Sequence, residues 1–453
     1  MRKKIEKQLP LMPPQKDHPQ SRELDCISEM LDSNPTITEK VLQDLNKGKN
    51  ISHCKGANGM SADQVLRSLI VKVLFGFSYQ DLAFHTVDSN TLKRFCRIGI
   101  ADSGFKKSAL NKNIKAISDE TLREINNITI GQAKLDGIEK GREVRIDCTC
   151  VESDIHDPTD SSLLWDAVRV MTRLVERCRD MCGIKVPGYQ NHERVAKRRA
   201  LSILNAKTEK FRNAKYRELL KITGKVLSYA DKSIEIIDKN ACTDLRAMAI
   251  SLDLQKYTGL TRKVMDQTTR RIIHDETVPA KDKVFSIFEP HTDIIIKDRR
   301  DNHYGHKICL TGGASNLILD CLVLEGNPAD SELVTPMLER QKDIYGKYPL
   351  KASFDGGFAS KDNLKEAKGL GVKDVCFAKK RGLEKLDMCR SHYVYNRLRK
   401  FRAGIESGIS WLKRSLGLTR CTWKGWESFK SYVWSSIVAA NLLTLARKKM
   451  AAA

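Results

Sequence analysis

Residues 143–151 read EVRIDCTCV, and this stretch marks a change in the pattern of the chain. Val144, Ile146 and Cys148 alternate with more polar positions such as Asp147. An alternation of period two is typical of a β-strand, whose successive side chains point to opposite faces. The stretch therefore predicts a strand that carries the carboxylate of Asp147.

Further strands and helices follow after a long interruption. Strands are expected at 306–311, 317–324, 351–354 and 372–378, the first two joined through Gly312-Gly313 as in a hairpin. Helices are expected at 331–345 and 361–368, with another after the last strand. With the 143–151 strand in front, this order predicts an α/β fold: a mixed sheet flanked by helices, as in the ribonuclease H fold.

The interruption of the sheet is helical and basic. Residues 163–282 show long helical runs with clusters of cations, among them Lys197-Arg198-Arg199. They predict a helical insertion subdomain after the first strand, suited to gripping DNA. Residues 136–162 and 283–450 would then form the ribonuclease H-like catalytic domain.

Residues 1–135 are expected to form an N-terminal helical domain. Four of the twelve prolines fall in residues 1–22, which indicates a loose arm. Ser61 and Gln64 have the spacing of a capping box, and two further short helices follow. The last of these carries Lys93 and Arg94. A helix-turn-helix and a plain helical bundle with solvated charges both fit this pattern.

The composition indicates the class of partner. The formal net charge is +23, from 79 Lys and Arg against 56 Asp and Glu, and such an excess favours a nucleic acid because phosphate contacts release counterions. The 13 cysteines have no regular spacing, which is typical of reduced thiols in a cytosol. The apolar stretch 68–77 is far shorter than the roughly 20 residues of a membrane span. We expect a cytoplasmic protein without a membrane partner.

Three carboxylates fall where such a fold would bring them together. Asp147 lies in the first strand, Asp355 directly follows the 351–354 strand, and Glu406 lies on the helix after the last strand. Hard carboxylate oxygens are the ligands that Mg²⁺ prefers, and phosphodiester cleavage by two metal ions needs them from different elements. Gly356-Gly357, after Asp355, leave room for a phosphate backbone.

The helix around Glu406 can be laid out at about 100° per residue. With Arg402 at 0°, Glu406 falls at about 40° and Lys413 at about 20°, while Ile405 and Leu412 fall between about 280° and 340°. Glu406 therefore borders the apolar face, flanked by two cations. An ordinary Arg-Glu ion pair on a solvated helix explains the same spacing, so the joint placement of the three acids carries the argument.

The three acidic segments resemble the motifs of bacterial insertion-sequence DDE transposases, closest to those called ISNCY-type. The segments are Ile146-Asp147-Cys148-Thr149, Phe354-Asp355-Gly356-Gly357-Phe358 and Arg402-Ala403-Gly404-Ile405-Glu406, supported by Tyr304-Gly305-His306-Lys307. Asp154 is a possible substitute for Asp147. In related transposases the last motif begins with a Tyr, where this chain has Arg399.

The resemblance implies the ribonuclease H fold, two Mg²⁺ or Mn²⁺ ions on the three catalytic acids, and inverted-repeat ends and target DNA as double-stranded substrates. It also implies a homodimer on DNA and a place at the bacterial nucleoid. The expected DNA contacts are Arg402, Lys413, Arg399, Lys307, Lys197, Arg198, Arg199, Lys93 and Arg94.

The interpretation is a DNA transposase that cleaves DNA strands at the ends of its element and transfers them to target DNA. A catalytically inactive relative acting as a DNA-binding repressor is the alternative. Intact acids at all three positions favour the enzyme. A cellular nuclease of the same fold is a third hypothesis, which the large basic insertion disfavours.

Overall fold

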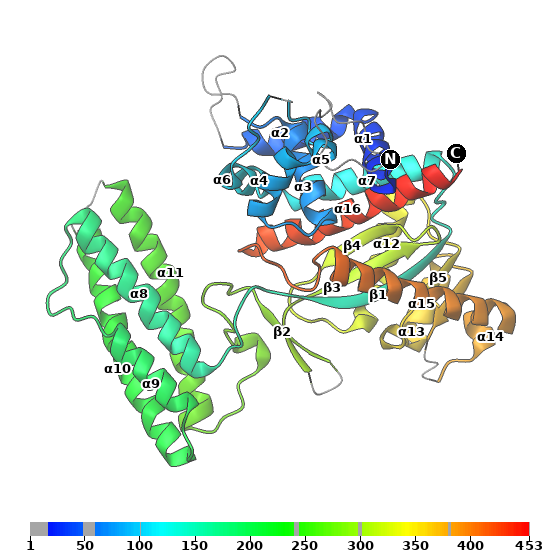
Figure 1. Ribbon diagram of the computed structural model, residues 1–453. Helices are drawn as coiled ribbons and strands as arrows, with labels where there is room; N and C mark the ends of the chain where they lie inside the picture. Colours follow the sequence, from blue (N-terminus) through cyan, green and yellow to red (C-terminus); the bar gives the residue numbers. More distant parts are fainter. Residues whose placement is uncertain are drawn as a thin grey trace, which may run out of the picture. The chain divides into compact units, whose positions relative to one another are not determined.

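The computed structural model describes residues 17–48, 59–99, 101–239, 244–297, 301–378 and 382–452 (Figure 1). Residues 1–16 of the expected N-terminal arm lie outside the described residues. The chain divides into two compact units, the first made of residues 1–151, 307–324 and 328–453 and the second of 152–306 and 325–327. The first unit includes both the N-terminal helices and most of the sheet, and the domain boundaries expected from the sequence stay a prediction.

The sheet has the expected mixed character. Its strands are β1 (Glu143–Glu152), β2 (Asp293–Lys297), β3 (Asp301–Gly313), β4 (Ile318–Val323), β5 (Lys351–Phe354) and β6 (Asp374–Phe377). β1 lies between β3 and β5, and β6 lies beyond β5. β1, β5 and β6 run parallel, whereas β4 pairs antiparallel with β3. The predicted α/β fold, a mixed sheet flanked by helices, is confirmed.

One strand was not predicted. β2 pairs antiparallel with the beginning of β3, with Asp293 opposite Gly305 and Lys297 opposite Asp301, and both stretches belong to the second unit. β3 consequently starts five residues before the strand expected from the sequence at 306–311. The short run Ile294, Ile295 and Ile296 lacks alternation with polar residues, so the period-two signal is missing there.

Parallel strands need crossover connections, and helices supply them here. α12 (Val334–Tyr345) precedes β5, α13 (Lys361–Gly369) connects β5 to β6, and α15 (His392–Ser415) follows β6 after the short α14 (Lys385–Met388). Short irregular helical turns lie at Thr269–Ile273, Ala280–Asp282, Asp330–Leu333 and Gly356–Phe358. Ala352, Ser353 and Phe354 of β5 are all buried, as expected of a parallel strand covered on both faces.

α15 is fixed to the parallel strands by side-chain hydrogen bonds. The Tyr395 hydroxyl donates to the Phe377 carbonyl of β6 over 3.2 Å, and the Ser353 hydroxyl of β5 donates to the Leu398 carbonyl over 3.2 Å. The helix begins after Ser391, whose hydroxyl accepts from the Val394 amide. These contacts determine which face of α15 is turned toward the sheet.

The N-terminal helices of the first unit are α1 (Pro19–Asp32), α2 (Pro35–Asn46), α3 (Ala62–Leu74), α4 (Tyr79–Asp88), α5 (Asn90–Phe95) and α6 (Lys107–Ile114). The capping box of Ser61 and Gln64 starts α3, as predicted. Arg67 of α3 is fully buried, and its guanidinium binds Asp32 and Asp63, each over 2.7 Å. A buried guanidinium needs such partners. The pair with Asp32 therefore links α3 to the end of α1.

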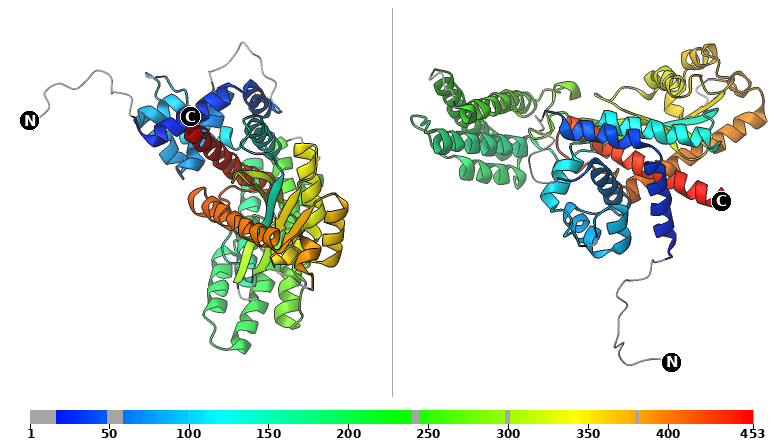
Figure 2. Two further views of the ribbon diagram at one scale, coloured as in Figure 1. Left: turned by 90° about the vertical axis from the view of Figure 1, so that its right-hand side faces the viewer. Right: turned by 90° about the horizontal axis from the view of Figure 1, so that it is seen from above.

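Two long helices cover β4. α7 (Asp119–Leu135) and α16 (Trp426–Ala452) run alongside one another (Figure 2). The Asn441 side chain of α16 donates to Asn126 of α7 over 2.6 Å and accepts from the Ile318 amide of β4 over 2.9 Å. None of the helices among the described residues is both long enough and apolar enough to cross a membrane.

The second unit contains the helical insertion expected after the first strand. α8 (Asp160–Cys182), α9 (Glu193–Leu204), α10 (Glu209–Lys239) and α11 (Leu245–Thr268) pack side by side (Figure 1). Their apolar faces form a core of their own, with Val168, Leu219 and Leu254 fully buried. The unit therefore has its own hydrophobic core, separate from that of the sheet.

Candidate active site

The three predicted acids come from three elements of the first unit. Asp147 lies in β1, Asp355 follows the last residue of β5, and Glu406 lies in α15. β1 and β5 are parallel neighbours in which Ile146 is paired with Phe354. Asp147 follows Ile146 and Asp355 follows Phe354, so the pairing of the two strands places the two acids side by side.

The guanidinium of Arg402 gathers the three acids. Its Nη1 lies 3.7 Å from Asp147 Oδ2 and 3.3 Å from Asp355 Oδ1, and its Nη2 donates to Glu406 Oε1 over 2.7 Å. The Arg402 side chain is 14% exposed, compared with 58% for Glu406. One nearly buried cation thus binds all three carboxylates, so the fold brings these residues together.

The electrostatics of Asp147 reflect this crowding. Burial raises the pKa of Asp147 to about 6, and the negative charges of Asp355 and Glu406 act in the same direction. The Cys148 amide, which donates to Asp147 Oδ1 over 2.8 Å, and the Arg402 guanidinium oppose this increase. Burial by itself would lower the pKa of Arg402, but Glu406, Asp355 and Asp147 together raise it. The site therefore holds more negative charge than one guanidinium fully offsets.

The titration of Asp147 gives a testable dependence of stability on pH. Because its folded pKa is raised from 3.8 to about 6, its contribution to stability is present below about pH 4 and is lost as the pH rises through about 6. In the Asp147→Asn variant this loss is absent. We expect the free energy of unfolding of the variant, relative to wild type, to increase by roughly 1–3 kcal/mol between about pH 4 and pH 7.

Urea unfolding in metal-free buffer at a series of pH values measures this difference. The exposed Asp154 provides a matched control, since an Asp154→Asn variant removes the same charge from a residue outside the cluster of acids. A flat difference for Asp147→Asn would contradict the raised pKa.

The donor chemistry of the site fits a hard divalent cation, because all three groups offer carboxylate oxygens. In the structure, however, the three carboxylates surround the Arg402 guanidinium. Across the described ranges, no three His, Cys, Asp or Glu side chains lie close enough together to hold a metal ion. Arg402 supplies the positive charge that the acids require in this arrangement. A metal bound by the acids would replace at least part of these contacts.

The position of Arg402 depends on a second arginine. Arg145 of β1 is 6% exposed, and its Nη1 donates to the Phe401 carbonyl of α15 over 3.1 Å. Its Nη2 donates to the Asn316 side chain in the turn between β3 and β4. Gly404 leaves the space for this guanidinium, because a Cβ there would collide with Nη1 and lie 2.8 Å from Cζ. Sequence reasoning missed Arg145, whose only signal was a cation in a buried strand.

A lysine and a further acid lie beside the turn after Asp355. Lys307 binds Asp330 Oδ1 over 3.0 Å and the Pro328 carbonyl over 2.7 Å, and its side chain is only 13% exposed. A Cβ on Gly357 would lie 2.6 Å from Asp330 Oδ2. The absence of a side chain at Gly357 therefore leaves the space that the Asp330 carboxylate occupies. Asp330 was not predicted, and Lys307 stays a predicted DNA contact.

The other predicted contacts with DNA are spread over both units. On α15, Arg399 is exposed and Lys413 is half-buried. In the second unit Arg198 is exposed, Lys197 lies over the Trp165 ring, and Arg199 pairs with Glu218. In the N-terminal helices Arg94 pairs with Asp25 over 2.7 Å, and Lys93 donates to the Asp102 carbonyl over 3.2 Å. These roles and the helix-turn-helix stay predictions.

Residues 265–442 match the family model of the transposase DDE domain. This part of the chain is therefore similar to transposase DDE domains, which form a family of nucleases and strand transferases. The match includes Asp355, Arg402 and Glu406, and it begins after Asp147. No curated protein and no solved structure matches the chain.

Proposed function

We propose that the chain is a DNA transposase that binds the inverted-repeat ends of an insertion sequence and catalyses metal-dependent strand cleavage and strand transfer. The observation that carries the proposal is the convergence of Asp147, Asp355 and Glu406 on one guanidinium, two of them in the segment that matches the transposase DDE domain. The acidic motifs favour the ISNCY-type group. In this proposal the protein acts as a dimer on two DNA ends at the bacterial nucleoid.

The catalytic roles follow from the positions of the acids. Asp147, Asp355 and Glu406 would hold two Mg²⁺ or Mn²⁺ ions, which would activate the attacking water or hydroxyl and stabilise the leaving oxygen. The sheet holds Asp147 and Asp355 rigidly on neighbouring strands, whereas the exposed Glu406 on α15 completes the set. Water would attack a phosphodiester at the element end, and the freed 3′-hydroxyl would then attack target DNA.

Arg402 has a double role in this proposal. In the arrangement seen here its guanidinium offsets part of the negative charge of the acids, and if metal ions took over that task it would be free to bind a phosphate of the DNA. Guanidinium groups suit both tasks because they bind carboxylates and phosphates with the same planar set of donors. Lys413 and Arg399 on the same helix, and the basic residues of α9, would contact further phosphates.

The decisive assay is strand nicking on a labelled DNA fragment that carries one end of the element, taken from the DNA flanking the coding sequence. Short inverted repeats there, bracketed by direct repeats, would identify the ends. The full-length protein with Mg²⁺ should nick the fragment at the repeat boundary and join the 3′ end to a second DNA. Specific binding without nicking or joining would favour the repressor alternative.

Metal binding is expected to be visible without DNA or activity. Mg²⁺ that binds only the folded state stabilises it, by about 2.7 kcal/mol at roughly 100 times the dissociation constant. Wild type should gain stability on addition of Mg²⁺, and Asp355→Asn should gain much less. Arg402→Gln should respond at lower Mg²⁺ concentrations, because the competing cation is removed from the three acids.

Thermal unfolding at constant ionic strength measures these shifts. Asp154→Asn is the control and should respond as wild type does. An equal gain in the wild type and in Asp355→Asn would show that Mg²⁺ binds elsewhere.

A further inference from the structure

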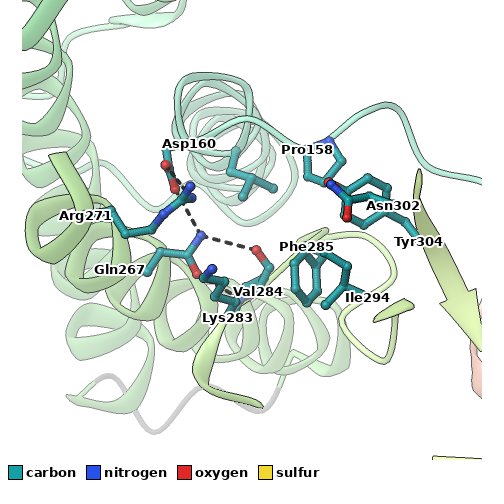
Figure 3. Close-up of a pocket in the computed structure, with 11 residues that line it drawn as sticks. Pro158, Asp160, Gln267, Arg271, Lys283, Val284, Phe285, Ile294, Asn302 and Tyr304 are labelled. Atoms are coloured by element: carbon teal, nitrogen blue, oxygen red, sulfur yellow. Dashed lines mark hydrogen bonds and ion pairs between the residues drawn. The ribbon is translucent and has the colours of Figure 1, made fainter. Parts of the chain in front are cut away.

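A pocket lies entirely within the second unit, outside the cluster of acids. Its cavity has a volume of about 200 Å³, which is room for several water molecules or for one small planar group. It is lined by residues from the start of α8, the end of α11, the segment after it, and the hairpin of β2 and β3. Figure 3 shows a polar group of side chains on one side of the pocket and an aromatic group on the other.

The polar side is a built network. Asp160 is 5% exposed, and its carboxylate accepts from Arg271 Nη1 over 2.7 Å and from Gln267 Nε2 over 3.3 Å. Gln267 is 2% exposed, and its side chain also exchanges hydrogen bonds with both backbone groups of Val284. Arg271 lies in a π-helical turn at the end of α11, a local irregularity that is common at functional sites. The arginine is thus held in place before any ligand arrives.

This side of the pocket has a surplus of positive charge. Among the residues that line the pocket, Arg271 and Lys283 face a single acid, Asp160, so these three side chains sum to one positive charge. Burial lowers the pKa of Lys283, and the neighbouring Arg271 lowers it further. A bound anion would remove the repulsion between the two cations. The network therefore favours a ligand with a negatively charged group.

The opposite side is aromatic. The rings of Phe285 and Tyr304 lie 5.6 Å apart between centroids, tilted by 44°, and Ile294 and Leu163 add aliphatic surface. Aromatic rings provide stacking surfaces for nucleic-acid bases. Asn302 is exposed at the pocket and offers an amide that can both donate and accept hydrogen bonds.

We propose that this pocket binds a single unpaired nucleotide of a DNA strand, with its phosphate at Arg271 and Lys283 and its base against Phe285 and Tyr304. The cations and aromatic rings that line the pocket favour a nucleotide of any source. The choice of DNA as that source rests on the proposed function. Tyr304 lies on β3, the strand that continues directly to Lys307 beside the turn after Asp355.

The test is binding of two labelled duplexes in buffer containing EDTA, where no cleavage occurs. One duplex is fully paired, and the other has one unpaired 2-aminopurine nucleotide. Wild type should bind the second duplex roughly tenfold more tightly, since stacking of one base is sufficient for such a preference. The fluorescence of 2-aminopurine should fall on binding as the base stacks.

The variants connect this preference to the pocket. Lys283→Met and Phe285→Ala should each remove most of the preference. Lys281→Met is the matched control: it removes the same charge from an exposed residue two positions away that does not line the pocket, and should retain the preference. Asn302→Asp adds a negative charge at an exposed residue and should weaken binding of the unpaired nucleotide, even if Phe285→Ala does not fold.

The outcomes separate this inference from the proposed function. Equal binding of both duplexes by wild type would overturn the inference, as would a preference that survives in Lys283→Met and Asn302→Asp or that is also lost in Lys281→Met. Failure to bind either duplex would count against the proposed function itself. Binding of a free deoxynucleoside monophosphate without any preference for the unpaired duplex would overturn DNA as the source and assign the pocket to free nucleotides.

Discussion

Amide variants of the three acids should lose strand nicking by a factor on the order of 10³ or more while binding end DNA with near-normal affinity. Asp147→Asn, Asp355→Asn and Glu406→Gln each retain the shape of the side chain and remove a charge that the proposed metal ions require. The acids converge on the same guanidinium, so each variant should damage the same site. Double variants should be hardly worse than single ones, because residues that act as a unit are not additive.

Gel-shift binding and single-turnover nicking on one labelled end fragment measure both properties for the same preparation. Asp154→Asn is the matched control and should nick at the wild-type rate. If Asp147→Asn nicks normally and Asp154→Asn does not, Asp154 is the first-strand ligand. If all three amide variants nick normally, the enzyme proposal fails.

Two glycines in one helix should respond to alanine with opposite signs. At Gly404 a Cβ would collide with the Arg145 guanidinium, which is buried and held by the Phe401 carbonyl. Forcing an extra group into a packed contact typically costs 1–3 kcal/mol, and displacing a buried charge from its partner adds to that. We expect Gly404→Ala to reduce the free energy of unfolding by about 3 kcal/mol.

Gly408, one turn further along α15, has no atom within 4 Å of the position of an added Cβ. Alanine is the better helix former by up to about 1 kcal/mol, so Gly408→Ala should stabilise the protein. Urea unfolding of the two variants measures the contrast. Nicking should also fall in Gly404→Ala, because the displaced segment carries Arg402 and Glu406. Equal stability of the two variants would show that Arg145 does not fix α15.

Local signals in the sequence determined the elements and their order. The alternation at residues 143–151 corresponds to β1, and the cap at Ser61 corresponds to the start of α3. These patterns predict structure because the alternation of side chains along a strand and the capping of the first helical amides depend only on residues a few positions apart. The strand that ends before Asp355 and the helix that carries Glu406 were predictable for the same reason.

The positions of Asp147, Asp355 and Glu406 in their predicted strands and helix also indicated that these three acids would lie together. The sequence did not indicate which side chain lies between the three acids. Helix geometry puts Arg402 and Glu406 one turn apart, but Arg402 also contacts Asp147, 255 residues earlier in the chain, and Asp355. Such contacts have no local pattern, so the sequence could not indicate that the guanidinium faces the acids.

The tertiary structure alone decided the surroundings of the site. Arg145 donates to the carbonyl of Phe401, which lies 256 positions later in the chain. Lys307 contacts Asp330 because the fold places β3 beside the segment that carries this acid. The pocket of the second unit likewise joins Asp160, Arg271 and Tyr304 from three separate elements. The physical reason is the same in each case: a charged or polar side chain that folding buries must find a partner, and the partner is set by packing, not by position in the chain.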